Sequence, residues 1–289
     1  DTQHTMKIPK RLSPLVEDGL VDEVVRQLQS GKEAAVFIVS RGDELFCAKV
    51  YKSAEHRSFQ RVAEYREGRK SRSSRDARAA GKRSRHGLKV QEAEWKSAEV
   101  EALYRLAQAG VRVPKPHGVH DGVLLMELVQ DEFGNPAPRL NEVDMTADQA
   151  RLWHGFMIEQ IVRMLCAGLI HGDLSEFNVL LGPLGPVIID LPQAVDAAGN
   201  NNAYRMLSRD VRNMRTTFAR FAPELAETDH AREMWDLYEA GDLRPDTVLT
   251  GRRIRREHAA DVDAVLDQID DARRENEARQ LGRENAESA

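Results

Sequence analysis

HGDLSEFN (residues 171–178), followed by VIID (residues 187–190), is the stretch that decides the fold of this chain. Asp173 and Asn178 stand five residues apart, and the apolar residues between Asn178 and Asp190 predict two short strands joined by a turn. Such a hairpin returns Asp190 to the neighbourhood of Asp173 and Asn178. Transfer of a phosphoryl group from ATP needs a carboxylate near the acceptor hydroxyl and oxygen ligands for Mg²⁺. These three side chains supply both.

A second signal is Lys49, which lies in the β-rich run LFCAKVY (residues 45–51). The run AAVFIV (residues 34–39) precedes it, and the turn-forming residues 41–43 join the two runs, so we expect a β-hairpin. A lysine that points into a phosphate-binding cleft must be held charged and oriented, and a carboxylate does both. Glu99, on a helix predicted from about residue 93 to residue 107, is the expected partner.

Periodic apolar residues predict further elements along the chain. A short amphipathic helix is expected before residue 30, on the spacing of Leu15, Leu20, Val21, Val24, Val25 and Leu28. A strand pair is expected around residues 119–128, and helices at about 147–167, 208–221 and 230–240. These elements place the chain in the α+β class.

Length and composition allow two lobes that share a cleft. The chain has 289 residues, of which 41% are hydrophobic and 31% charged, and its net charge is -5. It has no apolar run of the roughly 18 to 20 residues that span a bilayer, and its first residues contain no apolar signal core. We therefore expect a cytoplasmic protein with no membrane partner.

Residues 57–89 are dominated by Arg, Lys and Ser and contain little that could be buried, so we expect a flexible basic loop. Such a segment is usually only a solvent-exposed loop without a binding function. Its charge density also suits RNA, a ribosomal surface or an acidic protein.

Several motifs taken together resemble the RIO family of atypical protein kinases, in the bacterial type of its RIO1-like branch. They are residues 30–34 (SGKEA), the Lys49 strand, the spacing from Trp95 to Glu99, HGDLSEFN, and IIDLPQAV from residue 188. The resemblance covers about residues 15–221. It implies a two-lobed protein-kinase-like fold, with a small β-rich N-lobe and a helical C-lobe.

The same resemblance implies a nucleotide site for ATP. Its cofactor-binding residues would be Ser30, Gly31, Lys32, Lys49, Glu99, Met126, Glu127 and Val129. The first three would form an abbreviated phosphate-binding loop, and Lys49, oriented by Glu99, would contact the α- and β-phosphates. Met126 would close the back of the adenine pocket, while backbone groups of Glu127 and Val129 would bind adenine.

It also implies roles for the catalytic segment. Asp173 would be the catalytic base, and Asn178 with Asp190 would hold Mg²⁺, with Mn²⁺ as an alternative metal. Asp190 is also expected as the acceptor in a phosphoaspartate intermediate, which makes it catalytic as well. Asp210 would brace the backbone of the catalytic loop, and His171 is interpreted as a second brace rather than a base.

The predicted organisation follows from these motifs. We expect an N-terminal extension and helix at 1–29, an N-lobe at 30–129 that includes the basic loop 57–89, a C-lobe at 130–250 with the catalytic and metal loops, and a charged helical tail at 251–289. Gly172 stands where protein kinases usually have Arg, and Leu191-Pro192 stands where they usually have Phe-Gly. The elements that bind a peptide substrate are therefore expected to be reduced.

Three functions remain open at this stage. The first is an ATP- and Mg²⁺-dependent serine/threonine protein kinase that acts on itself or on a protein partner, or that hydrolyses ATP through an aspartyl phosphate. The second is a small-molecule kinase of the aminoglycoside or choline type, because the pattern H-G-D-x-x-x-x-N is also theirs. The third is an ATP-regulated scaffold that associates with the ribosome or RNA.

Overall fold

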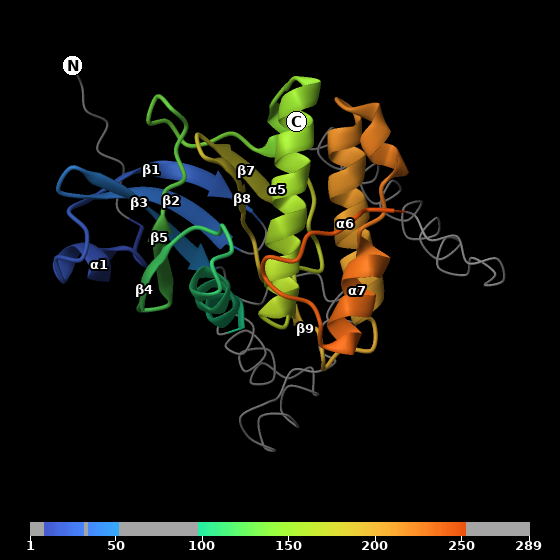
Figure 1. The fold of residues 1–289 in the computed structure, drawn as a ribbon. Helices are drawn as coiled ribbons and strands as arrows, with labels where there is room; N and C mark the ends of the chain where they lie inside the picture. Colours follow the sequence, from blue (N-terminus) through green and yellow to red (C-terminus); the bar gives the residue numbers. More distant parts are fainter. Residues whose placement is uncertain (1–8, 32–33, 52–97, 253–289) are drawn as a thin grey trace, which may run out of the picture. The chain divides into compact units, whose positions relative to one another are not determined.

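The computed structural model of the protein describes residues 9–31, 34–51 and 98–252 (Figure 1). By its internal contacts the chain divides after Arg252, and every described residue belongs to the first part. Lys32, the basic segment 57–89 and residues 253–289 of the expected tail lie outside the described residues. The domain boundaries proposed above stay predictions.

An antiparallel sheet forms the first half of the described chain, with the strand order β1-β2-β3-β5-β4. Its strands are β1 (Glu23–Ser30), β2 (Ala34–Arg41), β3 (Glu44–Tyr51), β4 (Pro116–His120) and β5 (Val123–Glu127). The β2–β3 hairpin and the β4–β5 pair were both predicted, and both are confirmed. Lys49 lies on the central strand β3, paired with Val36 of β2 and with Leu124 of β5. The sheet therefore holds the lysine from both sides.

The helix expected before residue 30 is wrong. The helix α1 covers only Ser13–Glu17, and residues 23–30 form the edge strand β1. Val24 is buried, but the other residues of β1 are exposed, Val25 and Leu28 among them. An edge strand with one buried position has no clear period of two, and β1 also contains two register irregularities against β2. Pairing with β2 decided the structure, and helical spacing of the apolar residues did not.

Helices dominate the second half, with small strand pairs between them. A helix at residues 98–108 precedes the β4–β5 pair. The later elements are η2 (Leu140–Glu142), α5 (Ala147–Cys166), β6 (Leu169–Ile170), β7 (Val179–Gly182), β8 (Gly185–Ile188), β9 (Val195–Asp196), α6 (Ala203–Ala219), η3 (Pro223–Glu227) and α7 (Ala231–Ala240). The three helices expected near 147–167, 208–221 and 230–240 are present as α5, α6 and α7. The α+β class is confirmed.

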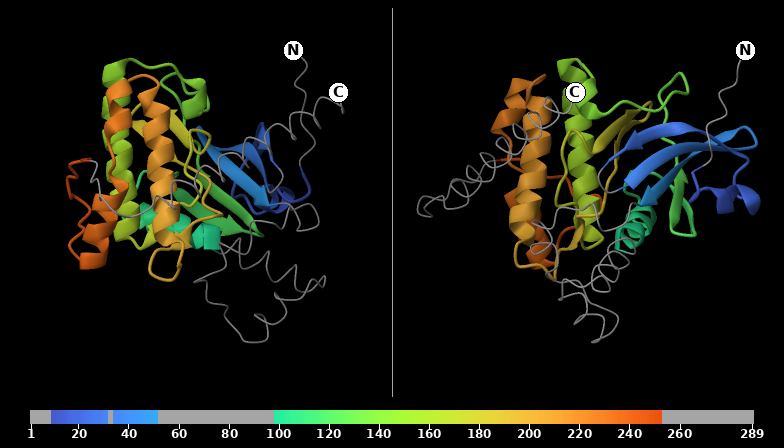
Figure 2. Two further views of the ribbon diagram at one scale, coloured as in Figure 1. Left: turned by 90° about the vertical axis from the view of Figure 1, so that its right-hand side faces the viewer. Right: turned by 180° about the vertical axis from the view of Figure 1, so that it is seen from behind.

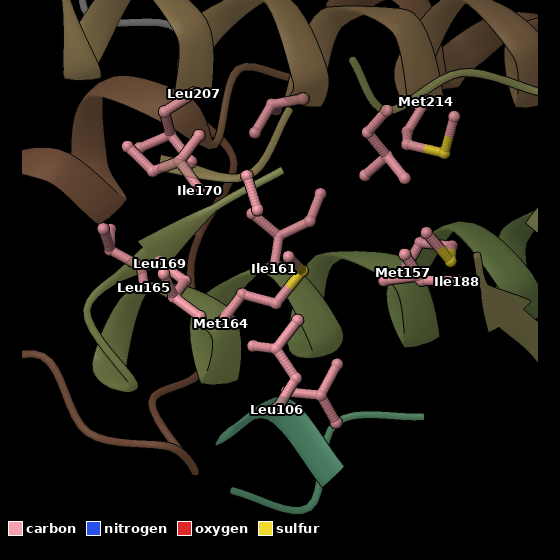
Figure 3. Packing of buried hydrophobic residues seen from close by; sticks show 14 of the residues in the cluster. Leu106, Met157, Ile161, Met164, Leu165, Leu169, Ile170, Ile188, Leu207 and Met214 are labelled. Carbon is pink, nitrogen blue, oxygen red and sulfur yellow. The ribbon is translucent and has the colours of Figure 1, made fainter. Parts of the chain in front are cut away.

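The helix α5 is the central element of the helical half. Thr146 caps its N-terminus by accepting a hydrogen bond from Gln149 N, and Gly168 follows its end with a φ of 76°. Figure 3 shows Met157, Ile161 and Leu165 of α5 among buried side chains from four other segments. Its labelled partners are Leu106 of the helix 98–108, Leu169 and Ile170 of β6, Ile188 of β8, and Leu207 and Met214 of α6.

Figure 1 and the right-hand view of Figure 2 place the sheet on one side of α5 and α6 on the other. The short strands β7 and β8 lie between α5 and the sheet, and the loop before β7 carries residues 171–178. This arrangement brings the two predicted motifs to the boundary between the sheet and the helices. Among the described residues, no helix is both long and apolar enough to cross a membrane.

Candidate nucleotide and metal site

A cavity of about 670 Å³ lies where the sheet meets the helical half. That volume suits a ligand of ordinary cofactor size. Eight residues predicted for the site line it: Gly31, Lys49, Glu99, Met126, Glu127, Val129, Asn178 and Asp190. Within the described chain, Ser30 and Asp173 lie outside this lining, and Lys32 is outside the described residues.

Lys49 joins three segments that are far apart in sequence. Its Nζ donates to Glu99 Oε1 at 2.5 Å and to Asp190 Oδ1 at 3.2 Å. The Lys49 and Glu99 side chains are 12% and 7% exposed, whereas Asp190 is 47% exposed. Burial alone would lower the pKa of Lys49, but the charges of Glu99 and Asp190 outweigh it and hold that pKa above its ordinary range. The expected ion pair is present, and the amine stays protonated.

Tyr51 is a member of this cluster that the sequence analysis missed. It lies two residues after Lys49 on β3, hence on the same face of the strand, and lines the same cavity. Lys49 Nζ is 5.6 Å from the centroid of its ring. Burial and the Glu99 carboxylate raise the pKa of the Tyr51 phenol. The period of two along β3 was the signal that could have found it.

The loop at residues 171–178 is braced by a buried carboxylate, as predicted. Asp210 of α6 accepts hydrogen bonds from Gly172 N at 2.8 Å and from Leu174 N at 2.9 Å. Gly172 has a φ of 81°, in the region that glycine adopts without strain. Arg209 donates to the Gly172 carbonyl, and Asn213 Nδ2 donates to the Leu174 carbonyl at 2.8 Å. One face of α6 therefore fixes both ends of the short segment that contains Asp173.

His171 is the second brace, which confirms its interpretation as a structural residue. Its Nε2 lies 3.0 Å from the Ile189 carbonyl, and its Nδ1 accepts from Asp173 N at 3.3 Å. The ring therefore joins the backbone beside Asp190 to the backbone of Asp173. Both nitrogens are engaged in holding the loop, so this geometry does not suit a proton acceptor for a substrate.

Asn178 and Asp190 have the donor chemistry of a magnesium site. Both line the cavity, and carboxylate and amide oxygens are the ligands that Mg²⁺ prefers. Asn178 Nδ2 donates to the Asp173 carbonyl at 2.9 Å, so its Oδ1 is the atom suited to a metal. The hairpin β7–β8 separates the two residues in sequence, and the Ile189 N to Asn178 O bond of 3.0 Å brings them together. The pair fits the metal, with phosphate oxygens and water to complete its shell.

Asp190 is held in an unusual backbone conformation. Its φ is 64°, in the left-handed region that residues with a side chain seldom occupy. Such conformations persist where the surrounding structure enforces them, and they are frequent at functional sites. Here the conformation accompanies a carboxylate that lines the cavity and contacts Lys49.

Residues 126–129, called the hinge below, line the cavity and include the residues expected to contact adenine. Glu127 N donates to the Lys115 carbonyl at 2.8 Å, so this N–H already has a partner. The Glu127 carboxylate accepts hydrogen bonds from both terminal nitrogens of Arg112, at 2.7 and 2.8 Å. The hydrogen bonding of Arg112 is the main cause that lowers the pKa of Glu127. Adenine contacts through backbone groups of Glu127 and Val129 stay a prediction, now limited at Glu127 to its carbonyl. Arg112 was not predicted from the sequence.

Ser30 and Gly31, which follow each other where β1 ends, are the described part of the predicted phosphate-binding loop. Ser30 is the last residue of β1, and Gly31 N donates to the Ala34 carbonyl at 2.9 Å. Of the three predicted loop residues, only Gly31 is seen to line the cavity. The roles of Ser30 and Lys32 stay predictions.

A family model described as the RIO domain matches residues 35–231. The RIO-type serine/threonine-protein kinase Rio1 of Haloferax volcanii is 37% identical over 207 residues, which cover 71% of this chain and 67% of that protein. Human serine/threonine-protein kinase RIO1 is 29% identical over 218 residues, 72% of this chain and 35% of that protein. This chain therefore spans two thirds of the Haloferax relative but well under half of the human one.

Among solved structures, the crystal structure of the Rio2 kinase-ADP/Mg²⁺-phosphoaspartate complex from Chaetomium thermophilum matches with a TM-score of 0.51 and 24% identity. The match covers 81% of this chain and 72% of that chain. It shows that the two chains share a fold. The prediction of a two-lobed protein-kinase-like fold is confirmed.

Proposed function

The chain belongs to the RIO family, and we propose that it is an ATP- and Mg²⁺-dependent serine/threonine protein kinase of the RIO type. One observation carries this proposal above the others. Lys49, Glu99 and Asp190, from three distant segments, meet within hydrogen-bonding distance in a cavity of cofactor size. The relatives named as serine/threonine-protein kinases support the same activity.

The proposed reaction is transfer of the γ-phosphoryl group to a hydroxyl. Asp173 accepts the proton of the attacking serine or threonine hydroxyl, a new O–P bond forms, and the bond to the ADP oxygen breaks. Lys49 binds phosphate oxygens, and Glu99 keeps it charged and oriented. Asn178 and Asp190 would hold Mg²⁺, which supplies positive charge to the phosphates. The braces from His171 and Asp210 fix the loop on which Asp173 stands.

Asp190 has a second proposed role as the acceptor of the phosphoryl group. Its carboxylate is half exposed, lines the cavity and lies beside the Lys49 amine. In that case ATP would be hydrolysed in two steps, through an acyl phosphate on Asp190. The solved Rio2 complex is described as a phosphoaspartate complex, which favours this route in a protein of the same fold. We further propose RNA or a ribosomal surface as a partner of the basic segment 57–89, on its composition.

Asp173→Asn tests the catalytic assignment. We expect phosphoryl transfer to fall by about 10²- to 10⁴-fold, the usual contribution of a positioned base, while ATP binding is retained because Asp173 lies outside the cavity lining. Transfer is measured with labelled ATP and Mg²⁺, and mass spectrometry distinguishes phosphoserine or phosphothreonine from an acyl phosphate on Asp190. Asp148→Asn is the matched control, because Asp148 is exposed at the start of α5.

The outcomes separate the three functions. Unchanged transfer in the Asp173 variant would remove this residue from the mechanism. Phosphorylation of an aminoglycoside or choline by the wild-type protein would favour a small-molecule kinase. Tight ATP binding without turnover, with any acceptor or with itself, would favour a scaffold.

A further inference from the structure

Arg139 lines the cavity and lies on a stretch of backbone that is paired with β7. Its main chain forms a bridge with Leu180 of β7, and Leu181 N donates to the neighbouring Pro138 carbonyl at 2.9 Å. Arg139 N also donates to Glu142 Oε2 at 3.0 Å, as part of the cap of η2. The residue is therefore fixed to the strand that follows the catalytic loop.

The Arg139 side chain contacts two segments that lie far apart in the sequence. Its Nη1 donates to the Phe177 carbonyl, and its Nη2 donates to Gln29 Oε1 at 2.6 Å. Phe177 immediately precedes Asn178, the proposed metal ligand. Gln29 immediately precedes Ser30 and Gly31, the described part of the proposed phosphate loop. One guanidinium thus touches the sheet and the helical half at the point where each contributes to the cavity.

The chemistry of these contacts explains why the residue is arginine. A guanidinium is planar and presents separate donors in a fixed fork, so it can hold two acceptors that lie in different directions. A lysine ammonium has a shorter reach across such a pair and no fixed fork. The bond to the Phe177 carbonyl also fixes the peptide group between Phe177 and Asn178, and hence the direction from which Asn178 enters the cavity.

We propose that Arg139 is a positioning residue that sets the metal-binding Asn178 and residues 29–31, at the end of β1, relative to each other. This inference rests on the proposed function of the cavity. Arg139 acts through Phe177 and Gln29, and the proposal requires no contact of its own with the nucleotide. Groups that orient a metal ligand typically change metal affinity by about 10- to 100-fold when they are removed.

Arg139→Met is the principal test. It keeps most of the aliphatic stem and removes both bonds. We expect the Mg²⁺ concentration for half-maximal transfer to rise about tenfold or more, and the affinity for Mn²⁺ in the presence of ADP, measured by electron paramagnetic resonance, to fall by a similar factor. Adenosine binding should change by less than about twofold, because in the described structure the side-chain hydrogen bonds of Arg139 go to Phe177 and Gln29 and not to residues 126–129.

Hydrogen exchange of the ligand-free protein supplies a readout that does not depend on activity. Peptides that contain residues 29–31 and 177–179 should exchange faster in Arg139→Met than in the wild type, while peptides from α6 remain unchanged. Arg151→Met is the matched control, because Arg151 also makes two side-chain bonds, to Glu224 and Asp148, but lies on the exposed side of α5. Gln29→Ala removes one arm of the contact and should accelerate exchange only at residues 29–31.

The results discriminate between roles. Equal exchange in wild type and Arg139→Met, or unchanged Mn²⁺ affinity, would overturn the proposal. An equal loss of adenosine and metal affinity would show a general structural role and would overturn it too. If Arg139→Met does not fold, Arg139→Lys decides, because it keeps the charge and should still weaken Mn²⁺ binding. Faster exchange in a protein that transfers no phosphate would support the contact while rejecting the kinase assignment.

Discussion

Glu99 and Asp210 are both buried carboxylates, yet the protein stabilises them in opposite ways. Glu99 is paired with a cation, Lys49, which comes from another element. Asp210 instead accepts two backbone N–H groups of the catalytic loop. A side-chain ion pair can re-form around an incoming phosphate, whereas two bonds to the main chain hold one loop conformation. The first region is suited to binding and release, and the second to constant geometry.

The two regions also differ in how burial acts on ionisation. Desolvation raises the pKa of Asp210, opposed by His171, by the N–H groups of Gly172 and Leu174, and by Arg209. At Lys49, desolvation is outweighed by two carboxylates, so its pKa lies above the ordinary range. Removing Asp210 should therefore cost more stability than breaking the Lys49–Glu99 pair. A buried carboxyl left without its partner can take up a proton, whereas a backbone N–H group left without its acceptor has no such way to adapt.

Asp210→Ala should have the largest effect. It leaves the N–H groups of Gly172 and Leu174 without their acceptor in a buried place, so the free energy of unfolding should fall by about 2–5 kcal/mol. Transfer should be lost as well, because Asp173 stands between these two residues. Urea unfolding followed by circular dichroism measures the first effect.

The variant Asp210→Asn refines this prediction. Its amide oxygen can accept one N–H, so the destabilisation should lie between those of wild type and alanine. Asp148→Ala is the control, because that carboxylate is 94% exposed. If Asp210→Ala unfolds at the same urea concentration as the wild type, the loop does not depend on the carboxylate.

The sequence pointed to the candidate catalytic residues because their relations are local. Asp173 and Asn178 share one loop, and a short hairpin returns Asp190, so spacing alone carries the information. Glu99 was expected because a lysine in a phosphate site needs a carboxylate, and the Trp95-to-Glu99 spacing of the family resemblance selected it among the glutamates of its helix. The Asp210 brace followed from the family resemblance, and the structure supplies its physical reason.

Contacts between distant segments could not be predicted in the same way. Arg139 meets Gln29 across 110 residues, and Arg112 meets Glu127 across a strand pair, with nothing in the neighbouring sequence that marks either arginine. The edge strand β1 was mistaken for a helix because it buries only one side chain. In both cases the deciding interaction comes from another part of the fold.

Replacing both members of the ion pair between Lys49 and Glu99 should separate the effect on stability from the effect on activity. Lys49→Met alone leaves Glu99 buried without its cation, which should cost about 1–3 kcal/mol of unfolding free energy, discounted for the open cavity. Lys49→Met combined with Glu99→Leu should recover most of that loss, since apolar residues can replace a buried ion pair. Transfer should stay abolished in both variants. If the double variant is no more stable than Lys49→Met, the stability lost in Lys49→Met does not come from leaving the Glu99 carboxylate without its cation.

The hinge pair, Arg112 with Glu127, should show the smallest effect, because its side chains are 34% and 30% exposed. Glu127→Gln should lower the free energy of unfolding by no more than about 1 kcal/mol near neutral pH. The Arg112 bond lowers the pKa of Glu127 below its ordinary 4.5, so the pair stabilises the protein above that value and loses its effect as pH falls through the lowered pKa.

Melting temperatures of wild type and Glu127→Gln, taken from about pH 6 down to about pH 3, should therefore converge on acidification. Arg112→Met should destabilise the protein at pH 6 by a similar amount, because it removes the same bonds from the other side. A difference between wild type and Glu127→Gln that persists or grows at low pH would mean that Glu127 acts through its shape. A different outcome is that Glu127→Gln lowers the free energy of unfolding near neutral pH as much as Asp210→Ala does. Solvent exposure would then not predict how much each carboxylate contributes to stability, and the contrast drawn between side-chain ion pairs and bonds to the main chain would fail.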